Sequence, residues 1–217
     1  MTDSLLTPTF LFHFAAPCLK VDKLWTADGA PLEAKHRIPC FAELQGGKSF
    51  AELRMGWNTD GLALWLEVRG KEQAPWCRPT RVEDSDGLQI WIDTRDTHNV
   101  HRAGKFCHRF ILMPSGAGKG LNEPAVQMLA INRCREMPKP VEPRVFKAHS
   151  EKRPTGYVLH AVIPAAALTG WDPVEHTKLG FTYAVIDREI GTQTFTVGTE
   201  FPFDEDPSLW GTLELTK

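Results

Sequence analysis

Hydrophobic and polar residues alternate along most of this chain, and the alternation is most regular between residues 51 and 68. Apolar side chains occupy every second position before and after a turn at 58–61, and the opposite positions carry mainly charged residues. A period of two is typical of a strand with one buried face, and Asn-Thr-Asp-Gly is typical of a tight turn. The pattern therefore predicts a hairpin whose buried face holds Ala51, Leu53, Met55, Trp57, Leu62, Leu64, Leu66 and Val68.

A second alternating stretch, residues 86–113, is divided by a polar connection. Residues 88–92 and 106–113 each follow the strand pattern, and the segment between them is polar apart from Val100 and Ala103. In β-rich domains, loops held by well-patterned strands commonly carry the functional side chains. We therefore expect a functional site here, drawing on Asp93, Arg95, Asp96, His98, Asn99, His101, Arg102 and Lys105.

The remaining pattern adds further short strands and a single helical turn. Strand-like segments recur at short intervals up to the C-terminal residues 210–215, and Pro164–Leu168 has the sequence of one helical turn, stopped by Thr169-Gly170. The chain shows no internal repeat, no amphipathic helix and no alternation of strands with helices. This organisation predicts an all-β fold, an antiparallel β-sandwich with one short helical turn, formed by residues 1–217 as a single domain.

Composition narrows the classes of function. The 217 residues carry a net charge of −2, which gives no electrostatic case for binding nucleic acid or an anionic membrane. The sequence shows no export signal and no apolar run long enough for a transmembrane helix. Its five cysteines are widely spaced without a CxxC pair, which favours reduced thiols and a cytoplasmic location; an exported protein without its signal is the alternative.

Four segments in the same order resemble the family 9 carbohydrate-binding modules. Residues 57–68 (WNTDGLALWLEV) and 84–96 (DSDGLQIWIDTRD) resemble two strands of that family. Residues 158–168 (VLHAVIPAAAL) with 178–189 (KLGFTYAVIDRE) resemble its block of a strand, a Pro-initiated turn and a further strand. Residues 206–215 (DPSLWGTLEL) resemble its terminal strand.

The resemblance implies a jelly-roll-like β-sandwich, related to the sugar- and haem-binding DOMON domains, and a non-catalytic protein that binds carbohydrate. Members of the family grip a sugar between two tryptophans with the help of polar and Arg side chains. Trp76 stands where the first of these is expected. No Trp follows Asp187 before Trp210, so the large rings available for the second are Phe195, Phe201 and Phe203.

A sugar ring needs an aromatic plate for its C–H face and hydrogen-bond donors for its hydroxyls. We therefore predict a pocket bordered by Trp76, by Arg102 or Arg109, and by Phe195 or Phe203. His108 and Arg109 alternate along one strand, so at most one of them faces this pocket. The other interpretation is a loop held in place by its own hydrogen bonds to Asp93 and Asp96. The complete set of predicted ligand-binding residues is Trp76, Arg95, His98, His101, Arg102, His108, Arg109, Phe195 and Phe203.

We expect no cofactor, with calcium at Asp93, Asp96 and Asn99 as the alternative. The set His98, His101, Cys107 and His108 lacks the spacing of a structural zinc site. Asp187 and Glu189 share one strand face as a glycosidase pair does, but no catalysis is expected from them.

Two alternative functions stay open at this point: a haem-binding DOMON-type domain with a His or Met ligand, and an interaction module without a sugar site. Trp65 and Trp91 stand on polar strand faces, either as a stacking platform or covered by the N-terminal segment with Phe10, Phe12 and Phe14.

Overall fold

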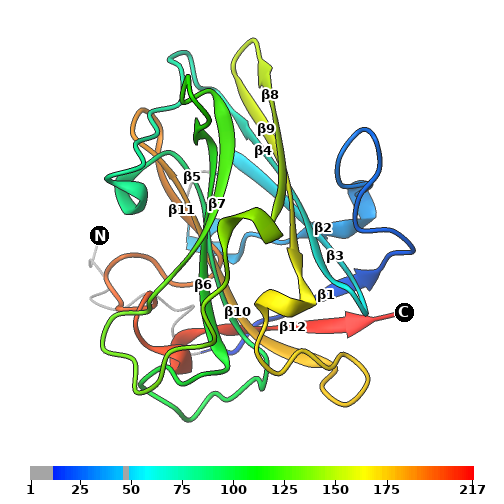
Figure 1. The fold of residues 1–217 in the computed structure, drawn as a ribbon. Helices are drawn as coiled ribbons and strands as arrows, with labels where there is room; N and C mark the ends of the chain where they lie inside the picture. Colours follow the sequence, from blue (N-terminus) through cyan, green and yellow to red (C-terminus); the bar gives the residue numbers. More distant parts are fainter. Residues whose placement is uncertain (1–11, 46–48) are drawn as a thin grey trace.

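The computed structural model describes residues 12–45 and 49–217, and these form an all-β fold (Figure 1). Twelve strands within this part of the chain belong to one continuous sheet. They are β1 Ala15–Lys20, β2 Arg37–Ile38, β3 Ala51–Asn58, β4 Gly61–Arg69, β5 Gly87–Asp93, β6 Cys107–Ala117, β7 Glu123–Leu129, β8 Lys147–Arg153, β9 Gly156–Pro164, β10 Lys178–Asp187, β11 Gly191–Thr194 and β12 Gly211–Thr216.

The strand order is β7-β6-β5-β10-β12-β1-β3-β4-β9-β8, with β11 added to β10 and β2 added to β3. The sheet folds over on itself, so that the layer containing β5, β6, β7 and β10 faces the layer containing β3, β4, β8 and β9 (Figure 1). The first and last strands, β1 and β12, are neighbours in this order and connect the two layers. The result is the β-sandwich that the sequence predicts.

The predicted strand faces are confirmed. Every position assigned to the buried face of the 51–68 hairpin is at most 7% exposed, and β3 pairs with β4 around Thr59-Asp60. Gly61 has φ 137°, and a Cβ there would collide with the carbonyl oxygen of Ile163, so the turn requires glycine. The core between the layers also contains the inward residues of β5, β6 and β10, including Ile90, Phe110 and Phe181.

Two details differ from the sequence-based expectation. The pairing is antiparallel except at β1, which runs parallel to both β12 and β3, because the chain enters the sheet between its last strand and its first hairpin. The predicted helical turn is present as the 3-10 turn Ala165–Ala167. Further 3-10 turns occupy loops without periodicity, namely Ala34–His36, Phe41–Gln45, Val82–Asp84, Pro143–Val145 and Pro207–Leu209. In the described part of the chain, no helix has the length and hydropathy to span a membrane.

Candidate functional site

Arg109 is the centre of a polar site on the outer face of the sheet. It lies on β6 with its side chain directed away from the core, since the neighbours His108 and Phe110 point inward. Its guanidinium donates from Nη1 to Oε1 of Glu83 (2.6 Å) and from Nη2 to Oε1 of Gln89 (2.8 Å). Only 6% of the Arg109 side chain is exposed, so both hydrogen bonds form in a partly desolvated setting.

A row of three residues crosses the sheet beside this guanidinium. Arg109 on β6 pairs with Trp91 on β5, which pairs with Thr182 on β10. The guanidinium carbon of Arg109 lies 5.3 Å from the centroid of the Trp91 ring. Nε of Arg109, Nε1 of Trp91 and Oγ1 of Thr182 are buried and have no hydrogen-bond partner within the described residues. Unpartnered buried polar atoms are costly, and three of those in the described residues occupy neighbouring positions in this row.

The segment after β11 forms the wall opposite. The Phe203 ring meets Trp91 edge-on, with centroids 5.5 Å apart and an interplanar angle of 84°. The indole Nε1 of Trp210 donates to the Phe203 carbonyl (2.7 Å) and fixes this segment to the start of β12. Phe201, two residues earlier, is half-buried against the same apolar cluster. Two aromatic rings therefore stand near the Arg109 guanidinium.

These groups enclose a cavity of about 300 Å³, which we call the Arg109 cavity. This volume is at the small end of the range for ligand pockets. The lining contains one guanidinium, that of Arg109, and two carboxylates, those of Glu83 and Asp204. The lining consists of Glu83, Gln89, Trp91, Arg109, Ala184, Ile186, Thr192, Thr199, Phe201, Phe203 and Asp204.

Trp76 lies near this cavity without lining it. Its ring is half-buried, and the guanidinium carbon of Arg188 stands over it, 4.1 Å from the centroid. The Trp76 amide donates to Oδ2 of Asp86 (2.8 Å), which fixes the loop before β5. The structure therefore places Arg109 and Phe203 in one cavity and Trp76 on the adjoining surface.

His98 and His101 lie elsewhere, at the opposite end of β10 from Trp76. Nε2 of His98 lies 2.9 Å from Asp96 Oδ1 and 3.0 Å from Thr212 Oγ1. Nδ1 of His101 lies 3.0 Å from both Asp206 Oδ2 and Ser208 Oγ. Burial raises the pKa of Asp206, but the Ser208 and His101 hydrogen bonds outweigh it, so the pKa is lowered.

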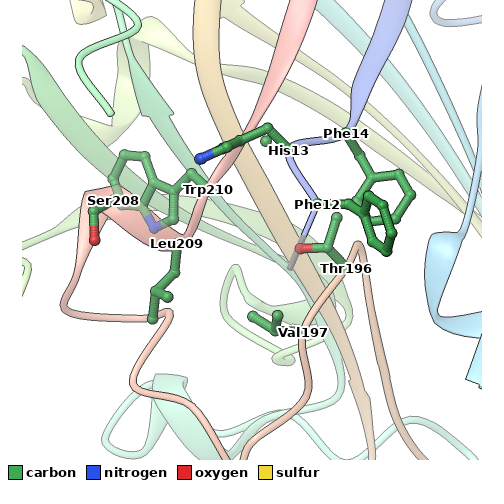
Figure 2. Close-up of a pocket in the computed structure, with 9 residues that line it drawn as sticks. Phe12, His13, Phe14, Thr196, Val197, Ser208, Leu209 and Trp210 are labelled. Carbon is green, nitrogen blue, oxygen red and sulfur yellow. The ribbon is translucent and has the colours of Figure 1, made fainter. Parts of the chain in front are cut away.

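A second cavity, of about 190 Å³, adjoins these histidines. Figure 2 shows it between Phe12–Phe14 on one side and Ser208, Leu209 and Trp210 on the other. The Trp210 indole N–H is already bonded to the Phe203 carbonyl, and the lining contains no Arg, Lys, Asp or Glu side chain. The Arg109 cavity, with charged, amide and aromatic groups together, is the better candidate site.

The predicted loop residues Arg95 and Arg102 bond to backbone instead. Arg95 donates to the carbonyl of Gly170 (2.7 Å) and stacks over the ring of Phe106, and Arg102 donates to the carbonyl of Arg133 (2.9 Å). The two carboxylate oxygens of Asp93 accept from the amides of Arg95 and Thr97. The loop is thus held by bonds within it, at Asp93, and by bonds to the carbonyls of Gly170 and Arg133 outside it. Within the described residues, no three His, Cys, Asp or Glu side chains form a group able to hold a metal ion.

Two predicted ligand-binding residues lie in the core, so a ligand on the outer face cannot reach them. His108 is fully buried, accepts from the Thr169 amide at Nε2 (2.8 Å), and has its pKa lowered to about 4 by burial. Phe195 is fully buried because its amide donates to the carbonyl of Tyr183, which continues the β11–β10 pairing and directs the ring inward. Alternation along the strands accounts for both positions.

Asp187 and Glu189 belong to a buried ionic cluster that also contains Lys71 and Asp86. Nζ of Lys71 lies 3.0 Å from Asp86 Oδ2, 3.0 Å from Asp187 Oδ1 and 3.4 Å from Glu189 Oε2. Asp187 Oδ1 also accepts from the amides of Glu189 and Ile190. These contacts hold the β10–β11 turn against the loop after β4. They give the two carboxylates a structural role.

Trp65 and Trp91 are both covered, by different segments. Trp65 carries the guanidinium of Arg54 over its ring, at 4.0 Å, and packs in the cluster formed with residues 21–32. Trp91 is 2% exposed and is covered by Phe203 from the other end of the chain. The segment that covers Trp65 is thus residues 21–32 and not the expected one, since Phe12 is 64% exposed and Phe14 stacks on Phe41. Phe10, which was expected to take part, lies outside the described residues.

The sequence interpretation missed Glu83 and Gln89. Glu83 belongs to the 3-10 turn Val82–Asp84, in a loop without periodicity, so no pattern indicated its approach to Arg109. Gln89 does have a signal: it is the polar residue directly before Trp91 on the outer face of β5, and it is 3% exposed.

No family model matches this chain, and no curated protein matches its sequence. Solved structures do match its fold. A family 9 carbohydrate-binding module from Caldicellulosiruptor kristjanssonii in complex with cellotriose superimposes with a TM-score of 0.65 at 14% identity, covering 94% of each chain. A module of the same family and organism in complex with glucose gives 0.64 at 14% identity, covering 93% of this chain and 95% of that one.

A candidate carbohydrate-binding protein from Bacteroides uniformis gives a TM-score of 0.58 at 13% identity, covering 94% of this chain and 100% of the other. The chain therefore has the fold of the family 9 carbohydrate-binding modules, which confirms the resemblance seen in its sequence as a resemblance of fold. The wider relation to DOMON domains stays a prediction.

Proposed function

We propose that this chain is a non-catalytic carbohydrate-binding protein and that it holds a sugar, alone or as part of an oligosaccharide, in the Arg109 cavity. Two structures of similar fold contain cellotriose and glucose. Their low sequence identity establishes the fold alone, so the proposal depends on the residues of this chain.

The observation that carries the proposal is that aromatic rings and a guanidinium held in a fixed position border the same cavity. Arg109 is held between Glu83 and Gln89, next to the rings of Trp91 and Phe203. A sugar presents C–H groups on its ring faces and hydroxyls around its edge, which suit aromatic rings and paired donors and acceptors respectively. The cavity volume of about 300 Å³ suits a single sugar ring better than a long segment.

The charges of the cavity favour a neutral sugar ring. The positive charge of Arg109 is offset by Glu83 at 2.6 Å, and Asp204 adds a second carboxylate to the lining. A carboxylate placed between these groups would meet repulsion as well as attraction. Hydroxyl groups can donate to Glu83 and Asp204 and accept from Arg109.

The absence of catalysis is also part of the proposal. A glycosidase needs one carboxyl group that gives up a proton and one that attacks or activates water. The pair considered from the sequence, Asp187 and Glu189, is bonded to Lys71 and to backbone amides. These bonds hold both carboxylates in place within the fold, and they lower the pKa of Glu189.

The test is calorimetric titration of the protein with glucose and cellotriose. Glu83→Gln should weaken binding about tenfold, as expected for losing one charge-assisted hydrogen bond. The substitution also removes the charged partner of the buried Arg109 guanidinium, so thermal melting is measured beside the affinity to confirm that the variant is folded. Glu175→Gln is the matched control: it removes an exposed carboxylate in the loop before β10. Failure of the unmodified protein to bind any neutral or uronic saccharide on a glycan array would refute the proposal.

The same sample distinguishes the haem-binding alternative. A haem protein would show a Soret band, whereas a sugar-binding protein should be colourless. The structure offers no specific observation that favours haem: His108, on the strand nearest the cavity, lies on the core face with both ring nitrogens in hydrogen bonds.

A further inference from the structure

Three guanidinium groups surround the ring of Trp76. The guanidinium carbons of Arg188, Arg78 and Arg81 lie 4.1, 5.4 and 5.9 Å from the ring centroid, respectively. All three Arg residues are exposed, and Trp76 is half-buried. We call this group the Trp76 cluster.

One buried carboxylate fixes the two segments that form the Trp76 cluster. Asp86 is fully buried, and its oxygens accept from the Trp76 amide (2.8 Å) and from the Arg188 amide (2.9 Å). Beneath them, Lys71 and backbone amides bond to Oδ1 of Asp187 and to both carboxylate oxygens of Glu189. The position of Arg188 over the indole is therefore set by buried contacts, which limits the entropy lost when a ligand binds there.

The three guanidiniums differ in what they already bind. Arg81 pairs with Asp84 (2.6 Å), and Arg78 donates to the carbonyl of Cys77 (3.3 Å). The Arg188 guanidinium makes no hydrogen bond or ion pair within the described residues, and it lies over the Trp76 ring. A guanidinium stacked on an aromatic ring keeps the N–H groups at its edge available, in the fork geometry that matches a carboxylate or a sulfate.

We propose that the Trp76 cluster binds an anionic substituent of a saccharide, with Arg188 as the residue that contacts it. The inference rests on the proposed function, because the saccharide itself is the one held in the Arg109 cavity. The two places are linked twice along the chain: Arg81 is two residues from Glu83, and Arg188 is two residues from Ile186, both of which line that cavity. The ligand class is thus an acidic saccharide with a neutral ring in the cavity and a carboxylate or sulfate ester at Arg188.

This arrangement also assigns a different role to Trp76 from the one its sequence predicts. Arg188 covers the ring at stacking distance, so a sugar cannot lie on that face. Trp76 instead supports the guanidinium, and Trp suits this role because the indole is the strongest cation–π acceptor among side chains. Trp76 is accordingly a positioning residue in this proposal.

The experiment compares three ligands that differ at one carbon: glucose, glucuronate and glucose 6-sulfate, titrated at pH 7 into the unmodified protein and into Arg188→Gln. The unmodified protein should bind at least one of the two anionic sugars about tenfold more tightly than glucose, and added salt should reduce this preference. Arg188→Gln should remove the preference and leave the affinity for glucose within about twofold. If glucuronate binds more tightly than glucose 6-sulfate, the preferred substituent is a carboxylate; the opposite order indicates a sulfate ester.

Lys178→Gln is the matched control, since Lys178 is an exposed cation at the start of β10, paired with Glu214, whereas Arg188 follows the end of that strand. It changes the net charge equally and should leave the preference intact. Equal affinity for glucose and both anionic sugars would overturn this inference and leave the proposed function standing. A preference that survives Arg188→Gln would also overturn it. Absence of binding to all three sugars would overturn the proposed function and this inference together.

Discussion

The ammonium nitrogen of Lys71 lies 3.0 Å from Oδ2 of Asp86, and the side chains of both residues are at most 2% exposed. Asp187 stands at the same distance on another side of the ammonium. Burial alone lowers the pKa of Lys71, but the hydrogen bonds to Asp86 and Asp187 outweigh burial, so the pKa is raised and the charge retained. These two ion pairs connect the loop after β4, the residue before β5 and the end of β10.

Replacing this lysine should therefore be strongly destabilising. Lys71→Met leaves two buried carboxylates without their cation, and such a loss costs about 3–5 kcal/mol of unfolding free energy. Lys178→Met, which breaks an exposed pair with Glu214, should cost at most about 1 kcal/mol. Urea denaturation of both variants measures the difference. Equal stability of the two would show that the Lys71 cluster is not as buried as described.

Stability should also fall in mild acid because of His108. Burial lowers the folded-state pKa of His108 from 6.5 to about 4. The unfolded chain therefore binds the proton more readily, and stability present above pH 6.5 is lost as the pH falls towards 4. The full loss corresponds to about 3 kcal/mol.

His108→Gln, which keeps an acceptor for the Thr169 amide, should flatten this part of the stability profile measured by denaturation between pH 7 and 4.5. Burial also lowers the pKa of His160, which should change stability with pH in the same direction. His160→Gln is therefore the comparison variant. A pH dependence that His108→Gln leaves unchanged would contradict the assignment.

The strand pattern predicted the fold better than it predicted the site, for a physical reason. Alternation reports which face a residue occupies, and this correctly separated Arg109 from His108. It carries no information where backbone geometry is irregular, so the approach of Glu83 to Arg109 was not predictable. The choice between Phe195 and Phe203 depended on how far the β11 pairing continues, which only the folded chain determines.

The prediction of a functional site in the 93–105 loop shows a second limit of sequence reasoning. A polar loop can recognise a ligand or satisfy its own backbone, and composition does not distinguish the two. Here Asp93 accepts from two loop amides, and Arg95 donates to the Gly170 carbonyl. The predictions of a cytoplasmic location and of a protein without calcium stay predictions.

The cysteines should differ in reactivity by their burial. Each of the five is present as a thiol, and burial raises the pKa of Cys18 and Cys107 to about 12, so thiolate is scarce at these positions. Cys134 is half-buried in a loop beside Met137. A thiol reagent should label Cys134 early in the native protein and Cys18 only on unfolding.

Peptide mapping after timed labelling measures this order, and Cys134→Ser should remove the part of the early label that maps to its peptide. In denaturant without reductant, five thiols should react per chain. Recovery of one or three would reveal a disulfide and contradict the structure.

The last prediction concerns the aromatic wall of the Arg109 cavity. Phe203→Leu keeps an apolar side chain but removes the ring that meets Trp91 at 84°. The edge-to-face contact contributes about 0.5–1.5 kcal/mol to stability beyond its buried area. The ring also borders the cavity, so its loss should weaken sugar binding by about 1–3 kcal/mol, in the range for truncated interface anchors.

Phe195→Leu is the control that separates these two effects. Phe195 is fully buried between Phe181 and Phe41, so the substitution should also cost stability, by an amount comparable to Phe203→Leu. It does not line the cavity, and the affinity for sugar should stay unchanged once the variant is folded. Calorimetric titration and thermal melting of both variants give the comparison. If Phe195→Leu weakened binding as much as Phe203→Leu, the loss would follow from general destabilisation, and the wall assigned to Phe203 would be wrong.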